Sequence, residues 1–161
     1  MLLIFTLVAL LVPMQRPTDV VKWSAEHPDA ASTDRRTVLV KVTADIQPGW
    51  KLYAIQQPKG GPKPLAFATP EGALFRVSKE HVIAPKSKVL PQDENFAVDT
   101  HYYETRAAFT IPVAVDRSIT AGTHEIPLEV TFQACGAELC LRPFTQKLPV
   151  KLSIEKQARP H

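Results

Sequence analysis

Hydrophobic and polar residues alternate along several stretches of the chain, which is the pattern of strands that bury one face. The clearest runs are Thr37–Ile46, where every second residue is apolar, and the longer Tyr102–Val115. Glu125–Ala134 and Leu148–Ile154 repeat the pattern nearer the C-terminus. Because a period of two places alternate side chains on opposite faces of a sheet, we predict four half-buried strands here.

Shorter strands are predicted between these runs, separated by segments rich in proline and glycine. The shorter strands are predicted at Asp19–Ser24, Trp50–Ile55, Leu65–Ala68 and Phe75–Ile83. Pro48-Gly49 is a turn, Gln56–Pro64 is a loop, and Ala84–Asp99, which lacks a clean period, is predicted to be a long irregular excursion. No stretch after the first apolar segment has a convincing 3.6-residue period. We therefore predict an all-β fold, an antiparallel β-sandwich.

Composition agrees with a single globular domain. The chain has 161 residues, of which 45% are hydrophobic and 22% charged, and it contains 15 prolines. Proline is excluded from helix interiors and central ladder positions, which favours short strands joined by loops. The formal net charge is +3, and lysines and arginines are scattered among acidic residues rather than gathered in a stripe. We therefore expect no nucleic-acid partner.

The N-terminus begins with an apolar run, Met1–Val12. It is shorter than the roughly 20 residues that span a bilayer, but it fits the core of a secretory signal. We predict a signal peptide over residues 1–16 and one domain over residues 19–155, exported to the periplasm or beyond. A buried N-terminal strand is the alternative. No second apolar run is long enough to span a membrane, so no span is expected after signal removal.

The segment FQACGAELCLRP, residues 132–143, holds both cysteines of the chain, Cys135 and Cys140. They lie between two predicted strands, where a turn brings the thiols within reach of a disulfide. One interpretation is a structural staple, although closing so short a loop gives only about 2 kcal/mol.

A metal clip is the second interpretation of the cysteine pair. Structural zinc needs four ligands, and the histidines are dispersed. They stand at His27, His81, His101, His124 and His161. None of them has ligand spacing from another, so the metal clip is the least favoured interpretation and no residue is assigned as a metal ligand.

A redox pair is the third interpretation, because two neighbouring thiols at the end of a sheet can exchange disulfides with a partner. Gly136 would permit a sharp bend, Arg142 would favour a thiolate on Cys140, and Glu138 would oppose it. The residues alone leave the staple, the metal clip and the redox pair open.

The cysteine segment resembles the N-terminal periplasmic domain of DsbD-type thiol:disulfide interchange proteins. That family has an aromatic-Gln-Ala/Gly-Cys pattern and a second cysteine followed by prolines, which Phe132–Cys135, Cys140 and Pro143 match, while Arg142 stands where proline is usual. Gly49–Ala54 is similar to its Gly-aromatic-x-Leu-Tyr strand. Asp93–Phe96 is similar to the segment containing its cap loop.

The resemblance implies an immunoglobulin-like β-sandwich that exchanges disulfides and needs no cofactor. A thioredoxin-like electron donor, a separate protein here, would reduce the domain, which would then reduce oxidised exported proteins. By similarity, Cys140 forms the mixed disulfides and Cys135 resolves them.

The resemblance also assigns roles to the cap-loop residues. Phe96 would cover the cysteine pair, and Asp93 and Glu94 would lie near the thiols and disfavour the thiolate. Tyr53, Tyr102 and Tyr103 are interpreted as core and surface residues rather than site residues. The alternative function is a non-catalytic immunoglobulin-like binding module with a structural disulfide.

Overall fold

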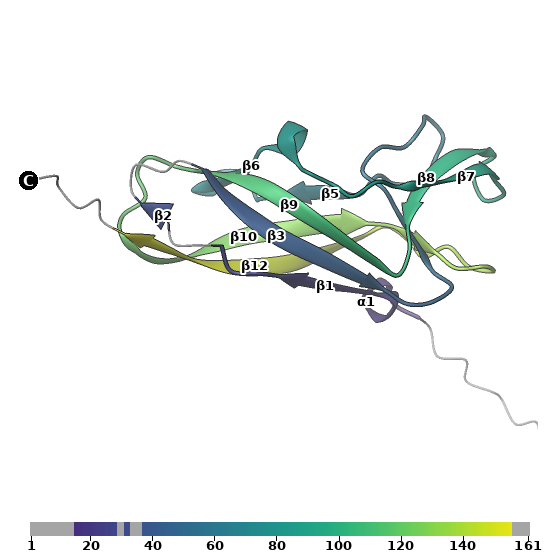
Figure 1. Cartoon of the computed structure of the whole chain (residues 1–161), viewed down its shortest axis with the longest axis horizontal. Coiled ribbons are helices and arrows are strands. Elements are labelled where there is room, and N and C mark those ends of the chain that lie inside the picture. Colours follow the sequence, from purple (N-terminus) through teal and green to yellow (C-terminus); the bar gives the residue numbers. More distant parts are fainter. Residues whose placement is uncertain (1–14, 29–30, 33–36, 156–161) are drawn as a thin grey trace, which may run out of the picture.

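A computed structural model describes residues 15–28, 31–32 and 37–155, so the first 14 residues of the predicted signal peptide lie outside the described part. The chain forms an immunoglobulin-like β-sandwich, which confirms the all-β prediction (Figure 1). The elements are α1 (Pro17–Val20), β1 (Val21–Ala25), β2 (Ala31–Ser32), β3 (Thr37–Ile46), β4 (Lys51–Tyr53), β5 (Ala66–Ala68), β6 (Phe75–Val77), η1 (Lys79–His81), β7 (Lys88–Asp93), β8 (Val98–Tyr103), β9 (Arg106–Val115), β10 (Gly122–Phe132), β11 (Ala134–Cys135) and β12 (Phe144–Glu155).

Two sheets form the body of the sandwich. One has the strand order β1-β3-β9-β6, and the other has the order β2-β12-β10-β5. The longest antiparallel ladders are β3 with β9 and β10 with β12, and the short β2 pairs with β12 in parallel. A third sheet of shorter strands, β11-β4-β8-β7, lies at one end, on the right in Figure 1.

The alternating side chains of the long strands form the core between the two main sheets. In β3 the even-numbered positions from Val38 to Ile46 are buried, as the pattern predicts. The Trp23 ring packs against Phe109 from the same sheet and against Phe67 and Phe132 from the opposite sheet, with centroids 5.6–6.1 Å apart. Aromatic contacts of this kind add to the hydrophobic burial that holds the sheets together.

The N-terminal strand begins later than predicted. Asp19 lies in the short helix α1, where its carboxylate accepts a hydrogen bond of 3.0 Å from the backbone N–H of Arg16. Pro17 occupies the first helical position, where a missing N–H has no consequence. Strand β1 therefore starts at Val21.

The predicted strand Tyr102–Val115 is divided in two. Thr105 has a φ of 66°, a left-handed conformation that interrupts a strand, and β8 and β9 lie on either side of it. The alternation continues across the break in sequence, but Tyr103 belongs to the small sheet and Ala107 to a main sheet. The prediction of one continuous strand was wrong because periodicity does not report a change of direction.

The predicted excursion Ala84–Asp99 contains β7 and the start of β8, which pair as a hairpin. Strand β7 is at the edge of the small sheet and is exposed along most of its length, so neither face had to be apolar. Its sequence includes Pro91, which edge strands tolerate. The predicted strand Phe75–Ile83 is also shorter, since β6 ends at Val77 and η1 follows.

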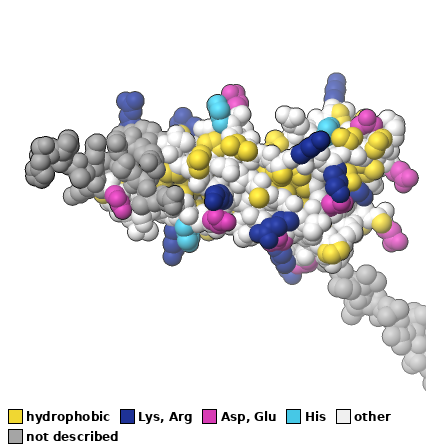
Figure 2. Space-filling model, in the orientation of Figure 1, with side chains coloured by type: hydrophobic (Ala, Val, Ile, Leu, Met, Phe, Trp, Pro, Cys, Tyr) yellow, Lys and Arg dark blue, Asp and Glu magenta, His cyan; other side chains and the backbone are white. Residues whose placement is uncertain are grey.

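The surface carries a mixture of side chains. On the face shown in Figure 2, acidic and basic groups are interspersed with hydrophobic ones. Among the described residues, no helix has the length and apolar character needed to cross a bilayer.

Candidate functional site

The small sheet positions the cysteine pair. Cys135 in β11 is opposite Lys51 in β4, and Tyr53 in β4 is opposite Tyr102 in β8. Side chains of directly paired residues lie on one face of a sheet, as do those two residues apart. Cys135, Lys51 and Tyr53 therefore share a face. Consistent with this, Lys51 Nζ lies 5.9 Å from the centroid of the Tyr102 ring.

The other face of the small sheet belongs to the core. Leu52 is paired with Ala134 on one side and with Tyr103 on the other, and all three are buried. The Tyr103 ring packs against Phe109 at 5.5 Å. The face that carries Cys135 is thus fixed by the apolar residues that alternate with it.

The two cysteines form a disulfide across a tight turn. Their Cα atoms are 4.1 Å apart. The backbone N–H of Leu141 donates to Ala134 O at 3.0 Å, and that of Gly136 donates to Leu139 O at 2.9 Å. Cys135 is 1% exposed, whereas Cys140 is partly exposed. Of the two, Cys140 is therefore the one more accessible to a thiol from solvent.

Gly136 does not serve the purpose predicted for it. Its φ is not in the left-handed region, so the bend does not depend on the conformational freedom of glycine. Instead, a Cβ added at Gly136 would lie 3.4 Å from the Trp50 ring. The small residue leaves room for this ring beside the turn.

Gln133 connects three segments around the turn. Its backbone carbonyl accepts a hydrogen bond of 3.2 Å from Tyr53 N–H. Its side-chain Nε2 donates to Leu141 O at 3.2 Å, and its Oε1 accepts from Lys63 N–H at 2.8 Å. Leu141, directly after Cys140, is thus tied to Gln133 between β10 and β11, and through Gln133 to the loop that contains Lys63.

Asp93, at the end of β7, is a buried carboxylate with a full set of partners. It is 2% exposed. Oδ2 accepts hydrogen bonds from Tyr53 Oη at 2.9 Å and Thr100 Oγ1 at 2.8 Å. Oδ1 accepts from the backbone N–H and side-chain Nδ2 of Asn95 at 3.0 and 3.1 Å. Asp93 therefore joins the β7–β8 connection to strand β4.

These contacts shift two pKa values. Burial by itself would raise the pKa of Asp93, but the hydrogen bonds from Thr100, Asn95 and Tyr53 together lower it below its ordinary value of 3.8. Burial, followed by the hydrogen bond and the negative charge of Asp93, raises the pKa of the Tyr53 phenol. At neutral pH the pair consists of an ionised carboxylate and a neutral phenol that donates to it.

Phe96 lies in the same connection and packs on Tyr53. The two rings meet edge to face, with centroids 5.5 Å apart. The loop is held in shape by Asp93 O, which accepts hydrogen bonds from the backbone N–H groups of Phe96 and Ala97 at 2.9 and 2.7 Å. Phe96 thus packs on Tyr53, one of the two β4 residues that share a face with Cys135.

The structure places the remaining site candidates at the surface. Glu94 follows Asp93 but is exposed, and Glu138 and Arg142 are exposed on and just after the cysteine turn. Leu139, at 52% exposure, adds an apolar side chain to the turn.

Sequence reasoning missed two residues of this region. Tyr53, interpreted as core or surface, provides the hydroxyl that joins Asp93 to β4, and Thr100 provides a second hydroxyl to the same carboxylate. The Leu-Tyr pair in Gly49–Ala54 was the available signal for Tyr53. No pattern in the sequence indicated Thr100.

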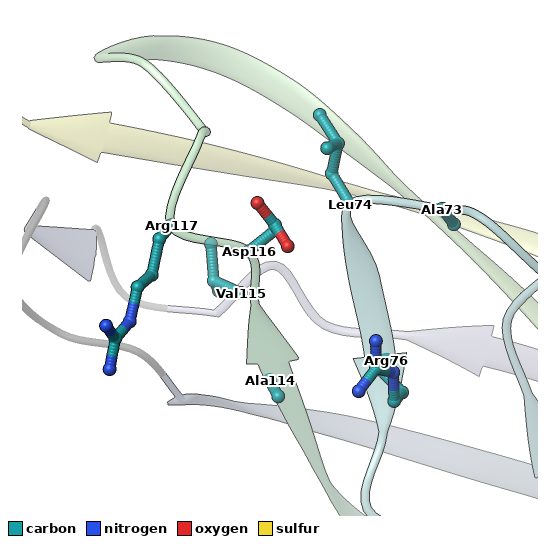
Figure 3. A pocket seen from close by; sticks show the side chains of 7 residues that line it. All are labelled: Ala73, Leu74, Arg76, Ala114, Val115, Asp116 and Arg117. Carbon is teal, nitrogen blue, oxygen red and sulfur yellow. The ribbon is translucent and has the colours of Figure 1, made fainter.

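A separate cavity of about 300 Å³ lies where β9 ends, far from the small sheet, which adjoins the start of β9 (Figures 1 and 3). It is lined by Ala73, Leu74, Arg76, Ala114, Val115, Asp116 and Arg117. None of the predicted site residues is among them. Within the part of the chain that the structure describes, no three His, Cys, Asp or Glu side chains cluster as metal ligands would.

Comparison with known families gives one match over most of the chain. Residues 20–152 match the family described as thiol:disulfide interchange protein DsbD, N-terminal. No curated protein matches the sequence.

Among solved structures, the N-terminal periplasmic domain of ScsB from Proteus mirabilis is similar, with a TM-score of 0.53 and 18% identity. The match covers 87% of this chain and 49% of that one, so the chain spans about half the length of this neighbour. The likeness shows a shared fold. The CssB subunit of enterotoxigenic Escherichia coli colonization factor CS6 has a TM-score of 0.41 at 12% identity, over 85% of this chain and 98% of that one.

Proposed function

The chain belongs to the family of DsbD N-terminal domains, and from this premise we propose that it is an exported thiol:disulfide exchange domain. It passes reducing equivalents between partner proteins through Cys135 and Cys140. The observation that carries the proposal is the disulfide at the end of the sheet, with Cys135 buried and Cys140 partly exposed.

The unequal exposure of the two cysteines supports distinct roles. A thiolate of a thioredoxin-like donor attacks Cys140 Sγ, and Cys135 leaves as a thiolate. The second donor thiol then attacks the donor's own sulfur in the mixed disulfide. This releases the reduced domain and an oxidised donor. Two electrons and two protons have then passed to the cysteine pair.

Delivery to an oxidised exported protein reverses these roles. The Cys140 thiolate attacks a disulfide of that protein and forms a mixed disulfide. Cys135 attacks Cys140 Sγ, the Cys135–Cys140 bond forms again, and the partner leaves with two thiols. Because Cys135 is buried beside Cys140, the second step is intramolecular and faster than attack by another protein.

The connection around Phe96 is proposed to protect the cysteine pair. Phe96 packs on Tyr53, on the face of the small sheet that carries Cys135, and Asp93 holds this connection against β4. We further propose that the carboxylates of Asp93 and Glu94 lie close enough to the thiols to disfavour thiolates, so that the reduced pair reacts slowly until a partner displaces the loop. Arg142 favours the thiolate form of Cys140, and Glu138 opposes it.

Trapping of mixed disulfides tests the proposal. Cys135→Ser leaves Cys140 without its resolving partner, so complexes that are normally short-lived accumulate. After expression with export and acid quenching, we expect higher-mass species that disappear on treatment with a dithiol. Mass spectrometry is expected to identify a thioredoxin-like protein among them.

Cys140→Ser is the matched control, because the remaining Cys135 is buried and is expected to trap far less. Equal trapping by both variants would contradict the assigned roles. If neither variant forms a mixed disulfide, the exchange function is wrong, and the structural disulfide of a binding module becomes the better description.

A further inference from the structure

We propose that Gln133 is a positioning residue that holds Cys140 ready to close the disulfide and thereby sets how strongly the domain holds its oxidised form. The inference deepens the proposed exchange function, on which its biological meaning rests. The observation behind it is the pair of side-chain hydrogen bonds of Gln133, one to Leu141 after Cys140 and one to Lys63 in the neighbouring loop.

The position of Gln133 relative to the two cysteines is the first step. It stands two residues before Cys135, and its Nε2 donates to the carbonyl of Leu141, the residue directly after Cys140. The side chain thus spans the base of the turn from one side to the other. In Figure 1 this turn is the segment between β10 and β12 at the end of the molecule next to the small sheet.

The orientation of the amide is fixed by its two partners. Lys63 N–H can only donate, so it requires Oε1, and Leu141 C=O can only accept, so it requires Nε2. The amide is also partly buried, which makes an unpaired group there unfavourable. One glutamine therefore anchors the turn to the loop that contains Lys63.

The consequence for redox chemistry follows from preorganisation. In the oxidised protein the S–S bond itself holds the two sides of the turn together. In the reduced protein that bond is gone, and the backbone bonds of the turn and the Gln133 amide keep Cys140 near Cys135. Without the amide, the reduced turn samples more conformations, and closing the disulfide must restrict them again.

Loss of the Gln133 side chain is therefore expected to favour the dithiol. The exchange with glutathione is balanced, because the Cys135–Cys140 disulfide and two glutathione thiols give two cysteine thiols and one glutathione disulfide. Loss of the side chain is expected to raise the equilibrium constant for this reduction about three- to tenfold, which corresponds to the net free energy of one hydrogen bond.

Two substitutions separate the hydrogen bond donated by Gln133 Nε2 from the bond accepted by its Oε1. Gln133→Glu keeps an oxygen for Lys63 N–H but cannot donate to Leu141 O while ionised. Gln133→Met removes both bonds without adding a charge. The equilibrium is measured for the purified whole domain in glutathione buffers, and in dithiothreitol buffers if the disulfide is too stable for glutathione. Alkylated thiols are counted by mass.

Gln57 provides a matched control. Gln57 lies in the loop that also contains Lys63. Its amide donates to Ala54 O and His101 O and accepts from His101 N–H, but none of these bonds reaches the cysteine turn. Gln57→Met is expected to lower the free energy of unfolding while leaving the redox equilibrium within twofold of the wild type.

The result that supports the inference is easier reduction of both Gln133 variants but not of the Gln57 variant. Equal redox equilibria for wild type and Gln133 variants, or an equal shift in Gln57→Met, would overturn it. The outcome does not depend on partner exchange. If the trapping experiment fails but the Gln133 shift is found, the proposed function is wrong and the positioning role stands.

Discussion

Asp93 shows at the scale of a single residue how a polar side chain is accommodated in the interior. A buried carboxylate is unfavourable unless hydrogen bonds replace its water, and Asp93 receives them from Tyr53, Thr100 and Asn95. These bonds outweigh burial and lower the pKa of its carboxyl. Asp93 therefore stabilises the fold in its charged form.

The pH dependence of stability tests this description of Asp93. Because its pKa is lower in the fold than in the unfolded chain, its contribution is fully present above the ordinary value of 3.8 and is lost as the pH falls through the folded value. Asp93→Asn is expected to lower the free energy of unfolding by about 1–3 kcal/mol at pH 7.

Urea unfolding of both proteins between pH 7 and pH 2.5 measures the effect. The two stabilities are expected to begin to converge as the pH falls below about 4, and to become similar once Asp93 is protonated in the fold as well. A difference that stays constant over the whole range would show that the charge of Asp93 contributes nothing.

At the scale of elements, the turns depend on two glycines for different reasons. Gly49, in the turn between β3 and β4, has a φ of 85° and no atom within 4 Å of an added Cβ. Gly136 in the cysteine turn has no such φ, but the Trp50 ring lies 3.4 Å from an added Cβ. Gly49 needs the backbone freedom of glycine, whereas at Gly136 the Trp50 ring leaves little space for a side chain.

Alanine substitutions separate these two cases. Gly49→Ala is expected to lower the free energy of unfolding by about 1 kcal/mol, because an L-residue is strained in the left-handed region. Gly136→Ala is expected to change it by less than about 1 kcal/mol, because van der Waals contact with Trp50 accompanies a loss of unfolded-state entropy. Chemical denaturation of the oxidised proteins compares them directly.

A larger loss of unfolding free energy in Gly136→Ala than in Gly49→Ala would contradict this assignment of roles. It would mean that the Trp50 ring cannot move by the few tenths of an ångström that contact demands. A shift of the redox equilibrium in Gly136→Ala would report the same strain at the turn.

At the scale of the whole molecule, the core rather than the disulfide maintains the fold. The disulfide closes a loop between residues only five apart. Phe109, in contrast, packs against Trp23, Phe67 and Tyr103, and so contacts both main sheets and a strand of the small sheet. The proposed exchange function needs this distribution, because the domain would have to stay folded both as the disulfide and as the dithiol.

Replacing both cysteines by alanine is expected to lower the free energy of unfolding by about 2 kcal/mol, the loop-closure entropy of a short ring. Phe109→Ala is expected to lower it by about 3–5 kcal/mol, through lost burial and a cavity. Denaturant titrations followed by tryptophan fluorescence measure both. An unfolded cysteine-free variant would show that the disulfide is a structural requirement and would weigh against exchange.

The sequence by itself determined the features that depend on neighbours along the chain. Alternation predicted the buried faces of β3, β9, β10 and β12, because a half-buried strand needs an apolar side chain at every second residue. The spacing of Cys135 and Cys140 placed their thiols within reach of each other, since five residues around a turn cannot separate far.

Only the tertiary structure decided which distant residues meet at the site. Tyr53 and Asp93 are 40 positions apart, and Lys63 and Gln133 are 70 apart, yet each pair is joined by a hydrogen bond. These contacts depend on the register of the small sheet and on the break at Thr105, where the chain passes from the small sheet to a main sheet. Register is set by how all the strands pack together, and no local pattern of hydrophobic and polar residues contains that information.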